Sequence, residues 1–188
     1  MLSLIVGGAA SGKSAYAERL VLGLDGPRVY VATMEPWDEE CVARIERHRA
    51  RRAGYGFQTI ECPRNLAGIE VRAHANVLFD CLGNLLANEM WQPEGNALLL
   101  IENSQEGSIP PWLLDVLAGV RHLNSQCDNL TIVTNEVCLA GTAYKGDTLP
   151  YLRAIAFLNR TIAAEADFVC EVVAGLPNVL KGEPPCAC

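Results

Sequence analysis

The chain has no apolar run long enough to cross a lipid bilayer, although half of its 188 residues are apolar. No basic segment precedes the first apolar stretch, so we expect no signal peptide and a cytoplasmic protein. Basic residues are in deficit, because 15 Lys and Arg stand against 22 Asp and Glu, for a net charge of −7. A basic surface is the usual footprint of nucleic-acid binding. The sequence therefore predicts a globular protein with neither a membrane span nor a nucleic-acid partner.

Long linkers, internal repeats and low-complexity segments are also missing, so we expect a single domain over residues 1–188. The eight cysteines show no spacing typical of a zinc site. Most stand singly among apolar residues, as Cys81 and Cys170 do, which favours buried free thiols over disulfides. Cys186 and Cys188 form a close pair, which we interpret as part of a frayed tail rather than as a metal or redox site.

What the sequence does contain is a phosphate-loop pattern near its start. Residues 7–14 read Gly-Gly-Ala-Ala-Ser-Gly-Lys-Ser, after an expected strand over Leu2–Val6 and before an expected helix over Ala15–Leu22. This strand–loop–helix setting is the one that the pattern requires, and it sets the segment apart from a glycine-rich turn followed by a chance Lys-Ser. The sequence therefore predicts binding of a nucleoside triphosphate.

The chemistry of this loop follows from its small residues. They let the backbone wrap a phosphate with its N–H groups pointing inward, and the helix N-terminus adds partial positive charge. Lys13 is expected to reach the outer phosphates, and Ser14 to ligate Mg²⁺. The expected nucleotide-binding residues of the loop are Gly7, Gly8, Ala9, Ala10, Ser11, Gly12, Lys13 and Ser14.

Strands and helices alternate along the rest of the chain. Expected strands are Arg28–Thr33, Phe57–Glu61, Asn76–Asp80, Leu130–Asn135, Phe168–Ala174 and Val179–Lys181. Expected helices are Asp38–Arg52, Leu66–Ala73, Leu82–Met90, Pro111–Asn124 and Tyr151–Ala166. Ala97–Glu102 fits a strand or a helix, and we favour a strand. The alternation predicts an α/β fold of the P-loop NTPase kind, with a mostly parallel sheet covered by helices on both faces.

In such a fold the carboxyl ends of the strands carry the ligand site. Ser14, Thr33, Asp80 and Asn135 lie at or just after these ends. Asp80 ends an apolar strand, so we interpret it as the Mg²⁺ anchor opposite Ser14 rather than as a cap of the next helix. Glu102 also follows an apolar run and is a weaker competitor for this role.

His48 is a candidate nucleophile on the expected helix Asp38–Arg52. Helical spacing places it on one face with Cys41 and Ile45. Neutral imidazole can attack an α-phosphorus and form a nucleotidyl-histidine, and arginines nearby would keep it neutral and hold phosphate oxygens. From the residues alone, a half-buried histidine on a solvated basic helix is the favoured interpretation, and the nucleophile is the alternative. The flanking arginines are Arg44, Arg47, Arg49, Arg51 and Arg52.

The other candidates carry weaker signals. Glu61 follows an expected edge strand, where it could accept hydrogen bonds from a base or ribose, or be an ordinary exposed acid. His74 and His122 lack surroundings like those of His48, so we expect structural or surface roles for them.

Taken together, these motifs resemble the bifunctional adenosylcobinamide kinase/adenosylcobinamide-phosphate guanylyltransferase family of cobalamin biosynthesis. The similarity covers nearly the whole chain, and the Arg-Ile-x-x-His and Thr-Asn-Glu-Val segments are its specific part. Besides the loop, the matching segments are Tyr30–Thr33, Arg44–Arg49, Thr59–Glu61, Asp80–Leu82, Asn88, Thr134–Val137, Asn159, Ala166–Val169, Gly175–Pro177 and Leu180–Lys181.

The resemblance implies a RecA-like sheet, a trimer and two reactions. In the first reaction adenosylcobinamide is phosphorylated by GTP or ATP, and in the second GMP is transferred to the product through a guanylyl-histidine at His48. It also implies nucleotide contacts from the phosphate loop and from Ala32, Thr33, Met34, Arg49, Arg51, Arg52, Glu61 and Asp80.

The chain departs from the family's usual pattern mainly in its C-terminal part. Residues 138–143 replace the usual Gly-x-Gly-Ile-Val-Pro, Tyr151–Arg153 replaces Phe-Arg-Asp, and Ala156–Arg160 replaces Gly-x-x-Asn-Gln. Gly83 stands in place of a threonine, and Ala10 in place of an arginine. Two alternatives therefore stay open at this point: a P-loop kinase of another small molecule, and a GTP-binding protein without turnover.

Overall fold

In the part of the chain that it describes, a computed structural model shows seven strands and a set of flanking helices. It describes residues 1–36, 38–91, 109–137 and 148–186, apart from the side chains of Arg44 and Arg51. The strands are β1 (Leu2–Gly7), β2 (Arg28–Ala32), β3 (Phe57–Glu61), β4 (Asn76–Asp80), β5 (Asn129–Asn135), β6 (Phe168–Val173) and β7 (Leu176–Lys181). The helices are α1 (Lys13–Leu22), α2 (Glu39–Arg52), α3 (Leu82–Met90), α5 (Pro111–Gln126), α6 (Thr148–Glu165) and the short 3₁₀ helix η1 (Leu66–Gly68).

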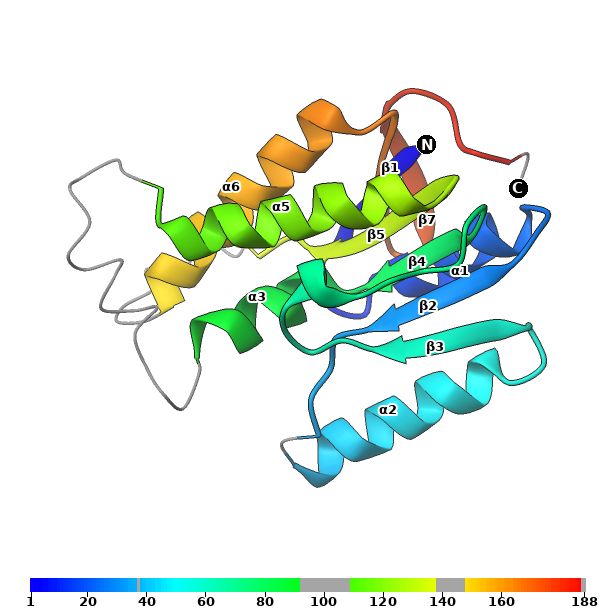
Figure 1. Ribbon diagram of the computed structural model, residues 1–188, viewed down its shortest axis with the longest axis horizontal. Helices are drawn as coiled ribbons and strands as arrows, with labels where there is room; N and C mark the ends of the chain where they lie inside the picture. The colour runs from blue at the N-terminus through cyan, green and yellow to red at the C-terminus, as the bar shows by residue number, and fades with distance from the viewer. Residues whose placement is uncertain (37, 92–108, 138–147, 187–188) are drawn as a thin grey trace.

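The strands form one sheet in the order β3-β2-β4-β5-β1-β6-β7. Every neighbouring pair is parallel except β6 and β7, which form an antiparallel hairpin. Helix α1 covers one face, α3, α5 and α6 cover the other, and α2 lies beside β3 at the edge of the sheet (Figure 1). The expected α/β fold with a mostly parallel sheet is confirmed. No helix in the described ranges is long and apolar enough to cross a membrane.

The sheet separates two apolar clusters because successive side chains of a strand point to opposite faces. In β1, Leu4 packs into the cluster under α3, α5 and α6, whereas Ile5 packs into the cluster under α1. In β2, Val31 and Tyr30 divide in the same way. Central strands buried on both faces read as near-continuous apolar runs, which is the pattern of Leu2–Val6.

The strand register brings the carboxyl ends of five strands to one edge. Gly7 in β1 pairs with Asn135 in β5, and Ala32 in β2 pairs with Asp80 in β4 on one side and Glu61 in β3 on the other. Side chains at or just after these positions therefore meet, as parallel sheets of this kind require for a ligand site.

The segment after β3 differs from its expectation. A helix over Leu66–Ala73 was the expectation, but only η1, Leu66–Gly68, forms. The backbone beyond it bonds to a side chain instead: the Val71 amide donates to Oε1 of Gln126 (2.9 Å), and Nε2 of Gln126 donates to the Ile69 carbonyl (3.1 Å). These bonds satisfy the groups that a helix would otherwise pair.

Other boundaries shift by a few residues. Helix α6 begins at Thr148 rather than Tyr151, since Pro150 is tolerated in a first helical turn. Strand β7 begins at Leu176 and includes Pro177, which fits an edge strand. Ala97–Glu102, with its expected strand and the candidate Glu102, lies outside the described residues.

The cysteines of the described residues follow expectation except at Cys186, which is disulfide-bonded and packs against the apolar cluster under α1, so the interpretation of this residue as part of a frayed tail was wrong. Free thiols are found at Cys41, Cys62, Cys81, Cys127 and Cys170. Cys62, Cys81 and Cys170 are buried, and the other two are partly buried.

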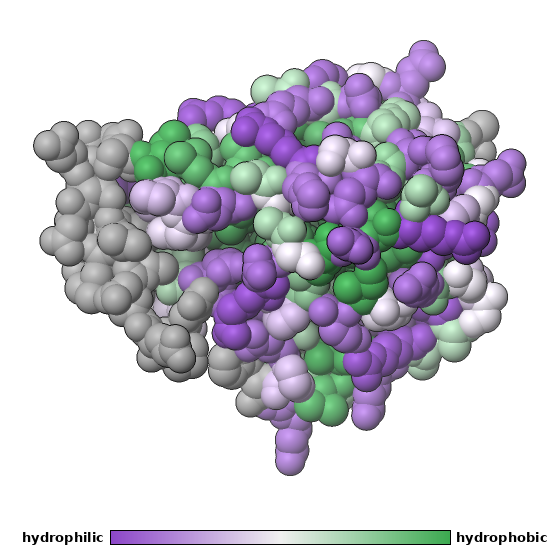
Figure 2. Space-filling view, viewed as in Figure 1, coloured by the Kyte–Doolittle hydropathy of each residue, from purple (hydrophilic) through white to green (hydrophobic). Residues whose placement is uncertain are grey.

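The outer surface is polar over most of the face seen in Figure 2. Apolar residues show in several separate places on this face, one of them toward the start of α5, where Ile109 and Leu114 are exposed. Scattered exposed apolar residues are normal on soluble proteins, so we attach no role to this patch.

The turn that ends β1 leads to a first prediction. A Cβ added at Gly7 would lie 2.5 Å from Ser11 Oγ and 2.7 Å from the Val172 carbonyl oxygen, whereas one added at Gly8 meets nothing within 4 Å. Gly7→Ala should therefore lower the free energy of unfolding by about 1–3 kcal/mol, as overpacking does. Gly8→Ala, the matched control, should change it by less than about 0.5 kcal/mol. Urea unfolding measures both, and equal effects of the two substitutions would contradict the packing argument.

Candidate nucleotide site

The phosphate loop runs from the end of β1 into α1. Ala10 and Gly12 have positive φ angles of 56° and 91°, and Gly12 caps the helix. A side chain is strained at such angles, so glycine is favoured at position 12. The Gly175 amide, from the β6–β7 turn, donates to the Ser11 carbonyl (2.8 Å) and supports the loop from outside. Nζ of the buried Lys13 donates to the Gly8 carbonyl (3.0 Å) and so lies across the loop.

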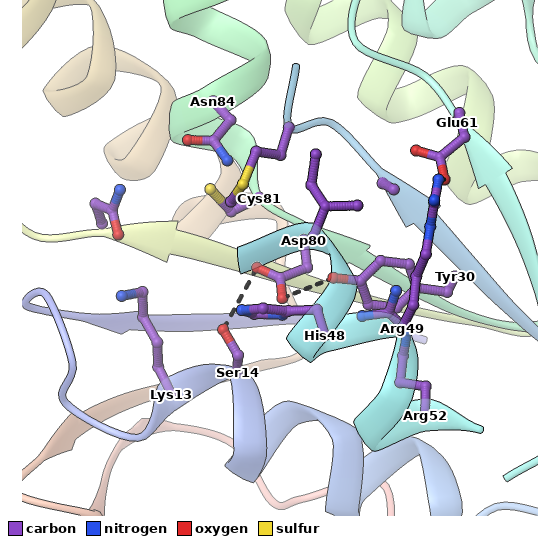
Figure 3. A pocket seen from close by; sticks show the side chains of 14 residues that line it. Lys13, Ser14, Tyr30, His48, Arg49, Arg52, Glu61, Asp80, Cys81 and Asn84 are labelled. Carbon is purple, nitrogen blue, oxygen red and sulfur yellow. Dashed lines mark hydrogen bonds and ion pairs between the residues drawn. The ribbon is translucent and has the colours of Figure 1, made fainter. Parts of the chain in front are cut away.

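A pocket opens where the loop meets the carboxyl edge of the sheet (Figure 3). It draws side chains from α1, from β2 and β4, from the edge strand β3 and from α2. Its lining residues are Lys13, Ser14, Tyr30, Ala32, Met34, Ile45, His48, Arg49, Arg52, Glu61, Asp80, Cys81, Asn84 and Asn135. Cationic, anionic and imidazole groups therefore face one cavity.

Asp80 is held between two hydroxyl groups. Ser14 Oγ donates to Asp80 Oδ1 (3.4 Å), and the Tyr30 hydroxyl donates to Asp80 Oδ2 (3.0 Å). Burial, and then the Asp80 carboxylate, raise the pKa of Tyr30 well above its usual value, so the phenol keeps its proton and donates. The Asp80 carboxylate thus directs Oδ1 toward Ser14, while Tyr30 holds Oδ2.

This arrangement fits a magnesium ion. A hydroxyl and a carboxylate supply the hard oxygen ligands that Mg²⁺ prefers, and it usually takes only one or two protein groups beside water and phosphates. Within the described ranges no group of three or more His, Cys, Asp or Glu side chains could hold a metal by itself. The donor set therefore fits an ion that arrives with a nucleotide better than a resident metal.

Helix α2 brings His48 to this pocket. The helix begins after Asp38, whose Oδ1 accepts from the Cys41 amide (2.7 Å), and that hydrogen bond lowers the pKa of the Asp38 carboxyl. His48 and Ile45, one turn apart, both line the pocket. In Figure 3 the imidazole points to the side where Ser14 and Asp80 lie. The inward face predicted from helical spacing is confirmed by this placement.

Two arginines of α2 lie in different settings. Arg49 forms an exposed ion pair with Glu61 (2.6 Å), so both groups are within reach of a ligand. Arg52 is only 6% exposed, and its guanidinium lies 3.3 Å from the centre of the Tyr30 ring. Its Nε and Nη1 are buried and have no hydrogen-bond partner among the described residues. Two buried nitrogens of a cation without hydrogen-bond partners favour an anionic ligand here.

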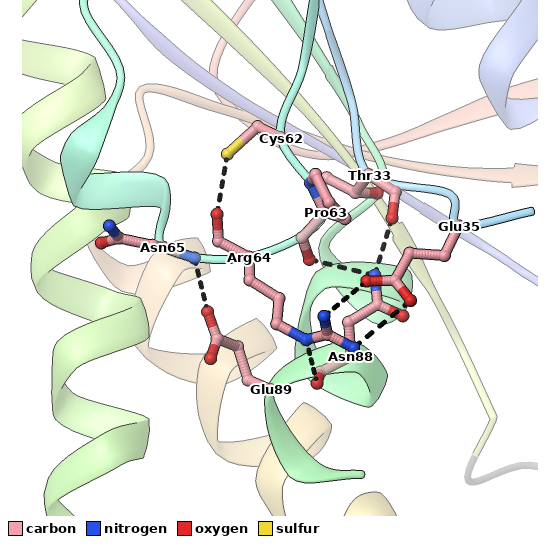
Figure 4. Close-up of polar contacts among 8 residues, drawn as sticks. All are labelled: Thr33, Glu35, Cys62, Pro63, Arg64, Asn65, Asn88 and Glu89. Atoms are coloured by element: carbon pink, nitrogen blue, oxygen red, sulfur yellow. Dashed lines mark hydrogen bonds and ion pairs between the residues drawn. The ribbon is translucent and has the colours of Figure 1, made fainter. Parts of the chain in front are cut away.

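A cluster of polar contacts fixes the loops that follow β2 and β3 (Figure 4). Nδ2 of Asn88, on α3, donates to the carbonyls of Thr33 (2.8 Å) and Pro63 (3.0 Å). Nε of Arg64 donates to the Asn88 carbonyl (2.9 Å), and its Nη1 pairs with Glu35 (2.9 Å). These contacts hold the connection that carries the chain from β2 toward α2.

The structure brings together most residues that the sequence singled out. Lys13, Ser14, Ala32, Met34, His48, Arg49, Arg52, Glu61 and Asp80 all line the pocket. Thr33 does not: it is fully buried, its hydroxyl donates to the Cys81 carbonyl (2.9 Å) and accepts from the Cys81 amide (2.9 Å). The Arg51 side chain lies outside the described residues, and loop residues 7–12 are not part of the pocket lining.

Sequence reasoning missed Tyr30, Cys81 and Asn84 as pocket residues. In the sequence, Tyr30 looks like one more apolar residue of a buried strand. The signal that could have identified it is its hydroxyl, which alternation places on the opposite face of the sheet from Val29 and Val31. Burial, and then the Asp80 carboxylate, raise the pKa of the Cys81 thiol to about 12, which makes it inert as a nucleophile. The two other histidines, His74 and His122, are exposed and outside the pocket, as expected.

Comparisons with known proteins show which family the chain is similar to. A sequence profile of the family described as cobinamide kinase / cobinamide phosphate guanyltransferase matches residues 3–180. The chain is 34% identical to the bifunctional adenosylcobalamin biosynthesis protein CobP of Pseudomonas aeruginosa, over 98% of this chain and 99% of the relative. It is 31% identical to the corresponding CobU protein of Salmonella typhimurium, over 96% of this chain and 100% of the relative.

A solved structure shows the fold independently. The chain is similar to an ATPase of the type III secretion system of pathogenic bacteria, with a TM-score of 0.52 and 12% identity. The match covers 95% of this chain and 56% of that one. At this identity the likeness concerns the fold alone.

Thr33 leads to a second prediction, in which two buried threonines are compared. Thr33→Val leaves the buried Cys81 amide without its partner, while the Cys81 carbonyl keeps the bond from the Leu85 amide (3.2 Å), and the lost amide bond should lower the free energy of unfolding by about 1–3 kcal/mol. Thr131 Oγ1 is buried without a partner, so Thr131→Val should be neutral or stabilising. Urea unfolding of both variants distinguishes them; a Thr33→Val protein as stable as wild type would show that the hydroxyl does not hold β2 to β4.

Proposed function

The chain belongs to the cobinamide kinase / cobinamide phosphate guanyltransferase family, and on this premise we propose that the pocket beside the phosphate loop performs both reactions on adenosylcobinamide. The observation that carries the proposal is that Lys13, Ser14, Asp80 and His48 line a single cavity. The first three belong to γ-phosphoryl transfer, and the imidazole belongs to attack at the α-phosphorus. Two reactions of one nucleotide then need only one site.

In the kinase step the phosphate loop holds the triphosphate of GTP or ATP. Backbone N–H groups at the start of α1 and the Lys13 ammonium bind the β- and γ-phosphate oxygens. The hydroxyl of the aminopropanol arm of adenosylcobinamide attacks the γ-phosphorus, and the bond to the bridging oxygen breaks. The nucleoside diphosphate leaves, and the acceptor becomes a phosphate ester.

Ser14 and Asp80 are the residues that would hold Mg²⁺ here. The metal, when bound, neutralises charge on the phosphate oxygens. The protein orients both ligands beforehand, because Tyr30 fixes Asp80 and the first turn of α1 fixes Ser14. Preset ligands lose little freedom when they bind.

In the second step His48 is the nucleophile. An imidazole nitrogen attacks the α-phosphorus of GTP, a phosphorus–nitrogen bond forms, and pyrophosphate leaves with the bridging oxygen. The phosphate of the acceptor then attacks the same phosphorus, the bond to nitrogen breaks, and adenosylcobinamide-GDP is released. Arg49 and Arg52 lie on α2 with His48, so they supply positive charge on the same side of the pocket as the imidazole.

Glu61 is our candidate for recognition of the base. Its carboxylate lines the pocket and forms an ion pair with Arg49. Because this pair is exposed and therefore weak, Glu61 can release Arg49 and bind a ligand instead. A carboxylate complements the two adjacent N–H donors on the edge of guanine, whereas adenine offers no such pair. This favours GTP over ATP in the transfer step.

The remaining parts of the proposal concern the whole protein. We propose that residues 1–188 act as one P-loop domain, supported by a sheet that includes strands from Leu2 to Lys181. The family resemblance supports a trimer that works in the cytoplasm. Sedimentation of the purified protein measures the first of these two properties.

His48 gives the decisive test of the transfer step. With GTP labelled in its α-phosphate, wild type should acquire an acid-labile, base-stable label, and His48→Ala should lower guanylyl transfer at least about a thousandfold. The matched control is His122→Ala, which removes an exposed histidine outside the pocket and should label normally. Equal labelling of His48→Ala and wild type would remove the nucleophile from the proposal.

Lys13 tests the phosphate loop. Lys13→Ala removes the charged donor of the loop, so GTP affinity in calorimetric titration should fall by about tenfold to a hundredfold. Lys181→Ala, on β7, removes a lysine of equal charge that bonds to the end of α6 and should leave affinity unchanged. Retained affinity in Lys13→Ala would place the nucleotide elsewhere.

A further inference from the structure

We infer that Tyr30 is a positioning residue of this site, which holds the Asp80 carboxylate toward Ser14 with its hydroxyl and seats the Arg52 guanidinium with its ring. The inference rests on the proposed function, because it concerns binding of a nucleotide with Mg²⁺ in the same pocket. It assigns a task to a residue that neither touches the phosphates nor takes part in the bond changes.

The hydroxyl acts through its hydrogen bond to Asp80. The torsion that turns a carboxylate is broad, so a free aspartate presents its oxygens in many directions. Here Oδ2 accepts from Tyr30 at 3.0 Å while Oδ1 faces Ser14 Oγ at 3.4 Å. Because the Tyr30 hydroxyl holds Oδ2, the carboxylate cannot turn freely, and Oδ1 stays directed toward Ser14. Tyr30 therefore selects the orientation that serves a shared ligand of Ser14 and Asp80.

The phenol itself has little freedom to move. Tyr30 lies in β2, paired with Thr59 of β3 and Leu78 of β4, and is only 3% exposed. Its ring meets Phe57 edge-on, with centroids 6.3 Å apart and an interplanar angle of 83°. Because two neighbouring strands and an aromatic contact hold Tyr30 in place, its hydroxyl can fix the orientation of the Asp80 side chain, which would otherwise rotate.

The ring has a second contact, with Arg52. The guanidinium carbon lies 3.3 Å from the ring centre, a distance at which cation and ring attract each other strongly once water is excluded. The ring contact orients the guanidinium without using its N–H groups, and Nε and Nη1 stay without hydrogen-bond partners among the described residues. Tyr30 thus contacts both Asp80, the proposed metal ligand, and Arg52, a cation that can bind a phosphate.

Tyr30→Phe separates the two tasks, because it removes the hydroxyl and keeps the ring. The half-saturating Mg²⁺ concentration for GTP binding, measured by calorimetry, should rise about tenfold, since a hydrogen bond to a charged group is lost. GTP affinity in the presence of a chelator should stay within about twofold of wild type, because phenylalanine keeps the ring against which the Arg52 guanidinium lies. Half-saturation at the wild-type Mg²⁺ concentration would overturn the role of the hydroxyl.

The matched control is Tyr16→Phe. Tyr16 belongs to the same apolar cluster under α1, and its hydroxyl interacts with Cys170 rather than Asp80. It loses the same atom from the same core, so a general loss of packing would act in both variants. A Mg²⁺ shift in Tyr16→Phe equal to that in Tyr30→Phe would show a structural effect only and overturn the inference.

Tyr30→Leu tests the ring. It removes the platform for Arg52 as well as the hydroxyl, so GTP affinity without metal should fall by about tenfold relative to Tyr30→Phe, as loss of a desolvated cation–ring contact predicts. Equal metal-free affinities of the Leu and Phe variants would overturn the second half of the inference. Thermal unfolding of each variant without ligand shows whether the fold is retained, and Tyr30→Phe keeps the first half testable if Leu is not tolerated.

A double substitution identifies the route of the effect. If the hydroxyl acts through Asp80, adding Tyr30→Phe to Asp80→Asn should shift the Mg²⁺ requirement by less than about twofold beyond Asp80→Asn alone. Fully additive shifts would overturn that route. If the wild type acquires no label at His48, only the proposed transfer reaction is contradicted. If GTP binding to the wild type does not depend on Mg²⁺, both the metal assignment and this inference are overturned.

Discussion

The hydrogen-bonded position of the Asp80 carboxylate, between Ser14 and Tyr30, is the contact on which the pocket depends. It joins the start of α1 to the carboxyl ends of two central strands, so the phosphate loop and the sheet edge become one surface. That contact is possible because Ala32 and Asp80 lie opposite each other in parallel register. A shift of one residue would turn the carboxylate to the other face.

His48, the proposed nucleophile, belongs to a helix outside the two apolar clusters. Helix α2 lies beside the edge strand, outside the two apolar clusters, and reaches the pocket with one face. Its approach is set by the contacts of Asn88 and Arg64 with the loops after β2 and β3. The site therefore combines a rigid half, built on the sheet, with a half whose placement depends on polar contacts.

Two departures from the family's usual residues lie against each other. A Cβ at Gly83 would be 3.0 Å from the Tyr151 hydroxyl, and that hydroxyl donates to the Gly83 carbonyl (3.3 Å). The phenol occupies space that a larger residue at position 83 would need. These departures compensate each other in packing near the pocket, and they leave Lys13, Asp80 and His48 in place.

Much of this protein follows from local sequence. The phosphate loop, the order of strands and helices, the inward face of α2 and the polar residues at the strand ends depend on short-range patterns, which alternation and helical spacing reveal. The end of η1 and the tasks of Thr33 and Tyr30 were decided by the tertiary structure. Gln126 bonds to a segment more than fifty residues earlier, Thr33 turns toward Cys81, and Tyr30 finds Asp80 across the sheet. Such partners are chosen by strand register and packing, which bring together groups whose separation in sequence carries no signal.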